Sequence, residues 1–180
     1  MTTYIALLRA INVGGHQKVA MTQLREFLVE LGFADVRSLL QTGNLLFRSD
    51  TTAGSELERR LEAEAAKRLD LRTDFLIRTA DEWTRVIERN PFADVAERNP
   101  SHLVVTFLKE APDERSVDAL RAAVTGPESI AADGNHLYIS YPHGIGRSCL
   151  TNALIEAKLG TRGTGRNWNT ILKLGTLIEA

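Results

Sequence analysis

Apolar residues in the first ninety positions follow two periodicities, which together predict alternating strands and helices. Between Met21 and Leu31 they recur at spacings of three, four and three residues, which places them on one face of a helix that Gly32 ends. Between Leu57 and Leu69 they recur at every fourth residue, which predicts a second helix with Ser55 near its start as a cap. Short apolar runs predict strands at residues 4–9, 36–40, 45–47 and 73–77. This order, strand–helix–strand–strand–helix–strand, is the split βαβ arrangement of ferredoxin-like folds.

The second half of the chain repeats this order in part. A helix predicted at residues 81–88 is followed by Asn90-Pro91 and Asn99-Pro100, and each proline disfavours helix at the residue before it. Beyond them the pattern predicts strands at 102–108, 128–132 and 136–141, and helices at 113–124, 149–159 and 167–178. The segment from Gly160 to Gly165 predicts no fourth strand. We therefore predict an α+β fold of two related ferredoxin-like (βαββαβ-type) halves, residues 1–90 and 101–180, with a linker at 91–100 and a C-terminal helix.

Composition limits the class of protein. The 180 residues are 43% apolar and 25% charged, so the chain can bury a full core as an ordinary soluble globule. Its apolar runs are strand-sized and its start lacks a signal-peptide pattern, which predicts no membrane segment and no export. The single cysteine, Cys149, provides no disulfide framework, and the four histidines lack metal-ligand spacing. These features predict a cytoplasmic protein with no metal and no cofactor.

Charge is distributed unevenly along the chain. Residues 1–20 and 141–180 hold seven Lys and Arg against Glu156 and Glu179, a net charge of +5, and the total of −1 leaves −6 for residues 21–140. If the two ends of the chain meet, they form a basic region that attracts anions. The excess is smaller than is usual for a protein that binds duplex nucleic acid. It therefore favours an anionic small molecule or single-stranded nucleic acid as the partner.

Three clusters rich in Asn, Gln, Thr and Gly separate the predicted elements, at residues 12–15, 41–44 and 166–170. The first follows Arg9 and precedes Lys18, and its glycines expose backbone N–H donors. The second is more simply explained as a hairpin turn. The third begins the final helix, where Trp168 is either a core anchor or a surface on which a base stacks. Its asparagines either bind the edge of a ligand or hold loops together.

The segment Gly144-Ile145-Gly146-Arg147-Ser148 joins a predicted strand to a predicted helix. Its glycines allow close approach to a ligand, Ser148 would cap the helix, and Arg147 adds positive charge, which predicts a phosphate or carboxylate site. It lacks the Gly-Lys-Ser/Thr of a P-loop, and Cys149 occupies the third glycine position of a dinucleotide fingerprint. The alternative is a plain strand-to-helix turn. Cys149 with His143 is the one candidate catalytic pair, and the sequence assigns no residue to orient His143.

The sequence resembles the DUF1697 family. The segments ALLRAINVGG, LLQTGNLLF, NPF, YPHGIGRSCLTN and RNWNTILKL follow one another in the order typical of that family, and the resemblance covers nearly the whole chain. The chain differs at Ala10, Ala20, Cys149 and Gly165, where the family usually has Gly, Pro, Lys and Thr. The resemblance implies an α+β fold with ferredoxin-like elements and implies no activity. The departure at Cys149 argues against thiol chemistry common to the family.

These observations favour a binding module for an anionic or nucleotide-like ligand, in a pocket formed where the two chain ends meet. One alternative is an enzyme whose neutral amides stabilise charge developing on a small polar substrate. Another is a structural interaction module in which the amides hold loops together. Under the first hypothesis, the ligand-binding residues are Arg9, Asn12, Gly14, Gly15, Lys18, Asn44, Gly144, Gly146, Arg147, Ser148, Arg166, Asn167, Trp168 and Asn169.

Overall fold

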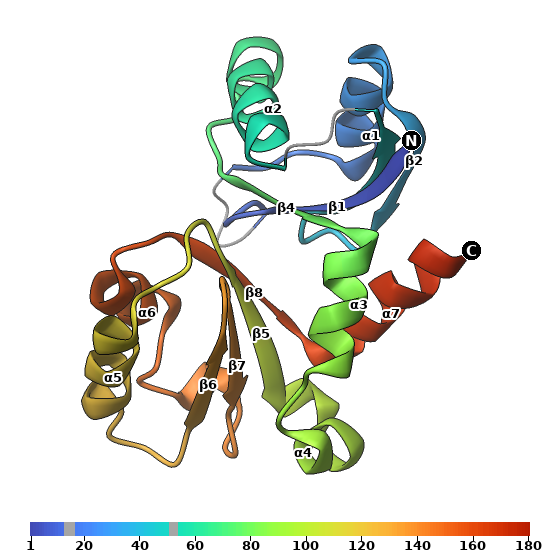
Figure 1. Ribbon diagram of the computed structural model, residues 1–180. Helices are drawn as coiled ribbons and strands as arrows, with labels where there is room; N and C mark the ends of the chain where they lie inside the picture. Colours follow the sequence, from blue (N-terminus) through green and yellow to red (C-terminus); the bar gives the residue numbers. More distant parts are fainter. Residues whose placement is uncertain (13–16, 51–53) are drawn as a thin grey trace. The chain divides into compact units, whose positions relative to one another are not determined.

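The computed structural model describes residues 1–12, 17–50 and 54–180 of the chain (Figure 1). Two of the predicted ligand-binding residues, Gly14 and Gly15, lie outside these ranges. The described chain divides into two compact units. Unit one consists of Met1–Arg85 together with Leu174–Ala180, and unit two consists of Val86–Lys173.

The first unit is a four-stranded antiparallel sheet in the order β2-β3-β1-β4, with α1 and α2 on the same face (Figure 1). Leu24 and Leu28 of the first helix and Leu57 and Leu61 of the second are fully buried against this face. The predicted helices are therefore confirmed, but Ser55 does not cap the second, because that helix already begins at Gly54. The elements are β1 (Thr2–Leu8), α1 (Met21–Glu30), β2 (Ala34–Leu39), β3 (Asn44–Ser49), α2 (Gly54–Leu69) and β4 (Phe75–Thr79), followed by α3 (Ala80–Glu88), whose residues from Val86 onward belong to unit two.

The second unit contains a sheet of the same kind, in the order β6-β7-β5-β8, with α5 and α6 packed together on one face (Figure 1). The short helix α4 lies within the predicted linker, between its two prolines. The elements are α4 (Ala93–Arg98), η1 (Pro100–His102), β5 (Leu103–Leu108), α5 (Glu114–Ala123), β6 (Ser129–Asp133), β7 (His136–Ser140), η2 (Ile145–Arg147), α6 (Asn152–Leu159) and β8 (Gly163–Asn167), followed by α7 (Trp168–Glu179), whose residues from Leu174 onward belong to unit one.

Strand β8 corrects the prediction that this half lacks a fourth strand. Its sequence, GTGRN, contains two glycines and one β-branched residue, so its own composition does not favour a strand. Pairing with β5 overrides that weak preference. A side chain at Gly163 would bring Cβ within 2.8 Å of Leu108 Cδ2 and of the carbonyl oxygen of Phe107, so the close approach of the two strands requires glycine there.

The two units repeat one another in register as well as in element order. Tyr4 to Leu8 of β1 pair with Thr79 to Phe75 of β4, and Val104 to Leu108 of β5 pair with Asn167 to Gly163 of β8. Each β5 residue in this comparison is therefore offset by 100 positions from its β1 counterpart, and each β8 residue by 88 from its β4 counterpart. The α+β class with two similar halves and a C-terminal helix is thus confirmed.

Carboxylates from the helices cover the outer edge of the repeated sheets. The backbone N–H of Phe75, at the start of the edge strand β4, donates to Glu62 Oε1 at 3.0 Å. At the equivalent point of β8, the N–H of Gly163 donates to Glu156 Oε2 at 2.8 Å. Further along β4, the N–H groups of Ile77 and Thr79 donate to Glu58 and Glu82. These acceptors satisfy donors that an edge strand otherwise presents to solvent or to another chain.

Candidate functional site

A cavity of about 130 Å³ lies in unit two, between the end of α5 and the loop that connects β7 to α6. We call it the loop cavity. It contains the predicted anion-binding residue Arg147 and both members of the candidate catalytic pair. Its lining residues are Ala123, Val124, Thr125, Gly126, Pro127, Glu128, His143, Arg147, Cys149, Leu150 and Leu154.

The β7–α6 loop is held by hydrogen bonds at both of its ends. The N–H of Tyr141 donates to the carbonyl oxygen of His102 at 2.8 Å, and its phenol donates to the carbonyl oxygen of Leu150 at 3.0 Å. Gly144 has φ +83° and ψ 153°, a backbone conformation essentially confined to glycine. Gly146 has no such requirement, because an added Cβ would meet no atom within 4 Å.

Ser148 does not have the predicted capping role. Helix α6 begins at Asn152, and Thr151 caps it by accepting the N–H of Leu154 at 3.2 Å. Ser148 lies three residues earlier, where its hydroxyl donates to Glu128 Oε1 at 2.6 Å and accepts the N–H of Leu150 at 3.0 Å. Ser148 therefore orients a carboxylate at the cavity wall, and the predicted helix N-terminal anion site is not formed by this residue.

The charged groups of the loop cavity have opposite signs. Glu128 is half-buried and fixed by Ser148, whereas Arg147 is exposed. Burial, and secondarily the negative charge of Glu128, raises the pKa of Tyr141 to about 12. The phenol therefore stays protonated at neutral pH and continues to donate to Leu150. An anion entering this cavity is attracted by Arg147 and repelled by Glu128, so the two charges favour one orientation of a ligand.

The same cavity brings together a thiol, an imidazole and a carboxylate, from Cys149, His143 and Glu128. Sequence reasoning missed Glu128, because its bond to Ser148 spans twenty residues and has no local signature. Ser148 orients the Glu128 carboxylate. Glu128 is therefore not the orienting group that the predicted pair of Cys149 and His143 lacks. Over residues 1–12, 17–50 and 54–180, no three His, Cys, Asp or Glu side chains are grouped so that they could hold a metal ion.

The asparagines predicted in the first two clusters hold loops together in unit one. Asn12 Nδ2 donates to the carbonyl oxygens of Val19 at 2.9 Å and Gln41 at 2.7 Å, and its Oδ1 accepts the N–H of Val19 at 2.8 Å. Asn44 is fully buried, and its Nδ2 donates to the carbonyl oxygen of Leu39. These bonds support the structural alternative for both residues.

The two cations of the first cluster also belong to unit one. Arg9 Nη1 lies 3.9 Å from Asp74 Oδ2, and its carbonyl oxygen accepts the hydroxyl of Thr73. Lys18 is exposed, next to Gln17, which donates to the carbonyl oxygen of Arg72. The residues predicted around Gly144 and Arg166 belong to unit two, so a single pocket formed by both chain ends stays a prediction.

The third cluster is placed differently from the prediction, because Arg166 and Asn167 end β8 and the helix begins only at Trp168. Asn167 Oδ1 accepts the N–H of Thr170 at 3.1 Å, so this amide caps α7. Trp168 is 5% exposed, which favours the core-anchor alternative and leaves little of its ring for stacking on a base. Asn169 is exposed.

Arg166 is buried, and its Nη1 donates to Thr164 Oγ1 at 2.7 Å and to the carbonyl oxygen of Gly165 at 2.8 Å. Burial lowers its pKa to about 10, so it stays protonated at neutral pH. Sequence reasoning missed its counterpart, Arg78, which occupies the same register position in β4 and likewise donates to the preceding carbonyl oxygen. Burial lowers the pKa of Arg78, and Glu58 and Glu82 oppose that shift. One sequence signal could have identified Arg78 and Arg166, because each arginine directly precedes the residue that caps the next helix.

Comparison with known proteins supports the predicted family and fold. The family model described as "Protein of unknown function (DUF1697)" matches residues 1–138. No curated protein matches the chain. Among solved structures, the chain is similar to the conserved bacterial protein SP0830 from Streptococcus pneumoniae, with 25% sequence identity, a TM-score of 0.77 and 97% of each chain covered. No helix in the part of the chain described by the structure is long and apolar enough to cross a membrane.

Proposed function

The chain belongs to the DUF1697 family of proteins of unknown function, and we propose that it is a binding module whose unit two takes a small anionic ligand in the loop cavity. The observation that supports this proposal is the place of Arg147. The sequence predicted this residue as the charged donor of an anion site, and its side chain lines a formed cavity beside His143.

The chemistry of the cavity suits a compact anion with a short apolar body. The guanidinium of Arg147 matches a carboxylate or phosphate in bidentate geometry. Val124, Leu150 and Leu154 provide apolar wall on which a hydrocarbon body packs. A cavity of about 130 Å³ is smaller than the roughly 300–1,000 Å³ of drug-sized ligand pockets. It therefore encloses a small molecule or the anionic end of a larger one.

A small molecule is better supported than nucleic acid as the partner. Recognition of single strands commonly uses exposed aromatic rings on which bases stack. Trp168, the predicted stacking residue, is 5% exposed. A nucleotide would have to enter the loop cavity by its phosphate and leave its base outside.

The test uses the monocarboxylates acetate, propionate and butyrate together with inorganic phosphate, each titrated into the full chain and followed by amide NMR shifts. We expect the shifts to concentrate at residues 143–150, and the carboxylate affinity to rise roughly fourfold per added methylene, on the order of 0.8 kcal/mol of buried CH₂. Arg147→Ala should weaken binding roughly ten- to hundredfold, as loss of a hydrogen bond to a charged group does.

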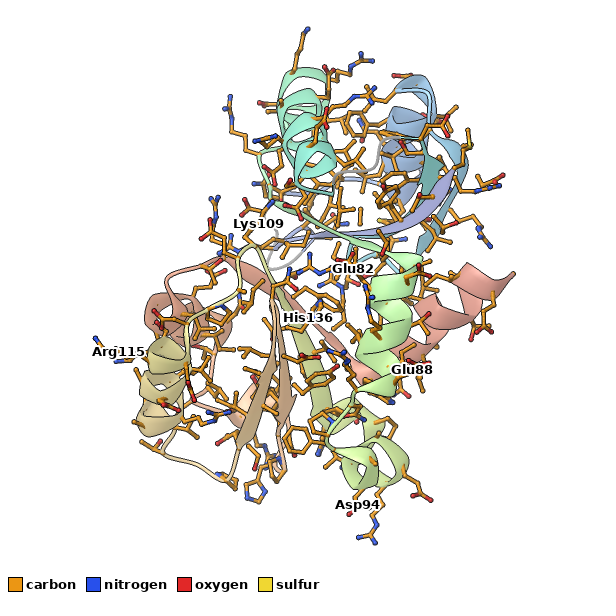
Figure 2. All side chains as sticks on the ribbon, in the orientation of Figure 1. Glu82, Glu88, Asp94, Lys109, Arg115 and His136 are labelled. Carbon is orange, nitrogen blue, oxygen red and sulfur yellow. The ribbon has the colours of Figure 1, made fainter. Side chains whose placement is uncertain are left out.

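The matched control is Arg115→Ala. Arg115 is an exposed arginine of the same unit that does not line the loop cavity, and it projects from α5 (Figure 2). Both variants lose one positive charge, so an equal effect on affinity would show a general influence of net charge and would refute the proposed site. Unchanged amide shifts at residues 143–150 with every probe would also refute it.

A further inference from the structure

The loop cavity contains a fixed carboxylate in addition to the cation that supports the proposed function. Glu128 belongs to the connection between α5 and β6, whereas Arg147 belongs to the loop between β7 and α6, and both line the cavity. Among the described residues that line it, no other is Lys, Arg, Asp or Glu. The acidic and basic groups of the lining are therefore one anion and one cation, which a ligand with negative charge alone does not match.

Two neighbours determine where the Glu128 carboxylate lies. Ser148 Oγ donates to its Oε1 at 2.6 Å, which ties the carboxylate to the β7–α6 loop. On another side lies Gly126, where an added Cβ would come 2.4 Å from Glu128 Oε2 and 3.1 Å from Cδ and Oε1. The carboxylate therefore packs directly on the backbone of Gly126, a close approach that the absence of a side chain permits. It is held at the cavity wall before any ligand enters.

A carboxylate held in this way can still accept hydrogen bonds from a ligand. Its two oxygen atoms offer about four lone-pair sites, and the Ser148 hydroxyl uses one of them. An ammonium group has three N–H donors and a positive charge, so its hydrogen bonds to a carboxylate are of the strong, charge-assisted kind. A second anion at the same place would be repelled. Glu128 thus favours a ligand that contains a cationic nitrogen.

We infer that the loop cavity binds a small amino carboxylate, in which a short hydrocarbon chain joins one carboxylate to one ammonium group. The inference rests on the proposed function, because Arg147 holds the carboxylate in both. Glu128 accepts from the ammonium group, and the chain packs on the apolar wall formed by Val124, Leu150 and Leu154. Such a ligand presents an opposite charge to each of the two charged side chains, which makes the match specific.

The experiment compares acetate, propionate and butyrate with the same acids bearing an ammonium group on the terminal carbon, namely free glycine, β-alanine and 4-aminobutyrate. Each is titrated into the full chain at neutral pH and followed by the amide NMR shifts of residues 143–150. The three amino acids differ in the separation of their charges. The one that matches Glu128 and Arg147 should bind roughly fivefold more tightly than its parent acid, the gain of a good ion pair that is only partly buried. Propylamine, which has no carboxylate, should bind more weakly than 4-aminobutyrate.

Glu128→Gln provides the decisive variant, because it keeps an oxygen that accepts the Ser148 hydroxyl and removes the negative charge. We expect opposite effects on the two classes of probe. The best amino carboxylate should lose its roughly fivefold advantage, whereas the parent acids should bind at least as tightly as before, since the repulsion is gone. A variant that only distorted the cavity would weaken both classes. Gly126→Ala, which displaces the same carboxylate, should reduce the advantage in the same direction, and Arg147→Ala should weaken both classes.

The matched control is Glu114→Gln, which also removes one negative charge. Glu114 is exposed in the first turn of α5 and does not line the cavity, so this variant should change either affinity by less than about twofold. If the parent acids bind but no amino carboxylate binds more tightly than its parent, the inference is wrong and the proposed function stands. Equal effects of Glu128→Gln on both classes, or propylamine binding as tight as that of 4-aminobutyrate, would have the same meaning. Unchanged shifts with every acid and amino acid would overturn both.

Discussion

At the level of single residues, the hydroxyl of Tyr141 joins the two ends of the loop beside the loop cavity, because it donates to Leu150 at 3.0 Å. Its pKa of about 12 in the folded chain lies above the ordinary tyrosine value of 10.0. A raised pKa means that the folded state holds the proton more tightly than the unfolded state. The stabilisation is therefore complete below pH 10 and is lost as the pH rises through 12.

We expect Tyr141→Phe to lower the free energy of unfolding at pH 7 by about 1 kcal/mol, since one buried hydrogen bond is lost. Between pH 10 and 12 the variant should lose less stability than the unaltered chain, because one ionising phenol is gone. Urea unfolding from pH 7 to 12 measures both effects. Tyr138, whose pKa burial also raises to about 12, remains in both proteins and serves as the common background. If the stability of the two proteins falls equally with pH above pH 10, the raised pKa does not belong to Tyr141.

The two glycines of the same loop differ in what the backbone requires of them. Gly144 has a conformation that costs another residue roughly 1–3 kcal/mol, whereas a Cβ added at Gly146 would enter open space. We expect Gly144→Ala to lower the urea midpoint by an amount equivalent to that cost, and Gly146→Ala to change stability by less than about 1 kcal/mol, in the stabilising direction. The reverse order of the two effects would show that the loop has a different backbone path.

At the level of the elements, the carboxylates of α2 cover the outer edge of β4. Glu62 accepts the N–H of Phe75, so Glu62→Ala removes the acceptor of a buried donor and should cost about 1–3 kcal/mol. Glu62→Gln keeps an acceptor oxygen and should cost less. Thermal unfolding compares the two variants, and equal losses would show that the charge, not the hydrogen bond, is what stabilises the edge.

The sequence predicted elements well where the side chains themselves determine them. The spacing of apolar residues from Met21 to Leu31 is enough to define α1, because one helical face must be buried. Strand β8 was missed because its formation depends on β5, which is about sixty residues earlier, and its own glycines give no strand signal. Ser148 was misassigned because Thr151, three residues later, caps the helix instead, so that α6 begins at Asn152.

The candidate site could be predicted in part for the same physical reason. A glycine with an unusual backbone conformation and an arginine three residues later are local features, so the sequence located the Gly144–Arg147 loop. The contacts of Glu128 with Ser148 and of Asn12 with its partners join residues that are apart in the sequence. The local sequence pattern therefore did not predict them. Arg78 was overlooked because β4 and β8 share few residue types, although they share a register.

At the level of the whole molecule, the two units share one sheet framework. The same strand order, the same strand-end hydrogen bonds and the same carboxylate at the edge are found in both. The shared sheet framework therefore does not depend on the ligand binding that we propose for unit two. Loss of the proposed site by substitution should leave the sheets intact.

The constant offset of 100 residues between β1 and β5 gives this chain an internal standard. Arg9 and Lys109 experience the same solvent, temperature and concentration, because they are parts of one molecule. A difference in behaviour between the two positions therefore reports their immediate surroundings together with the difference between an arginine and a lysine side chain.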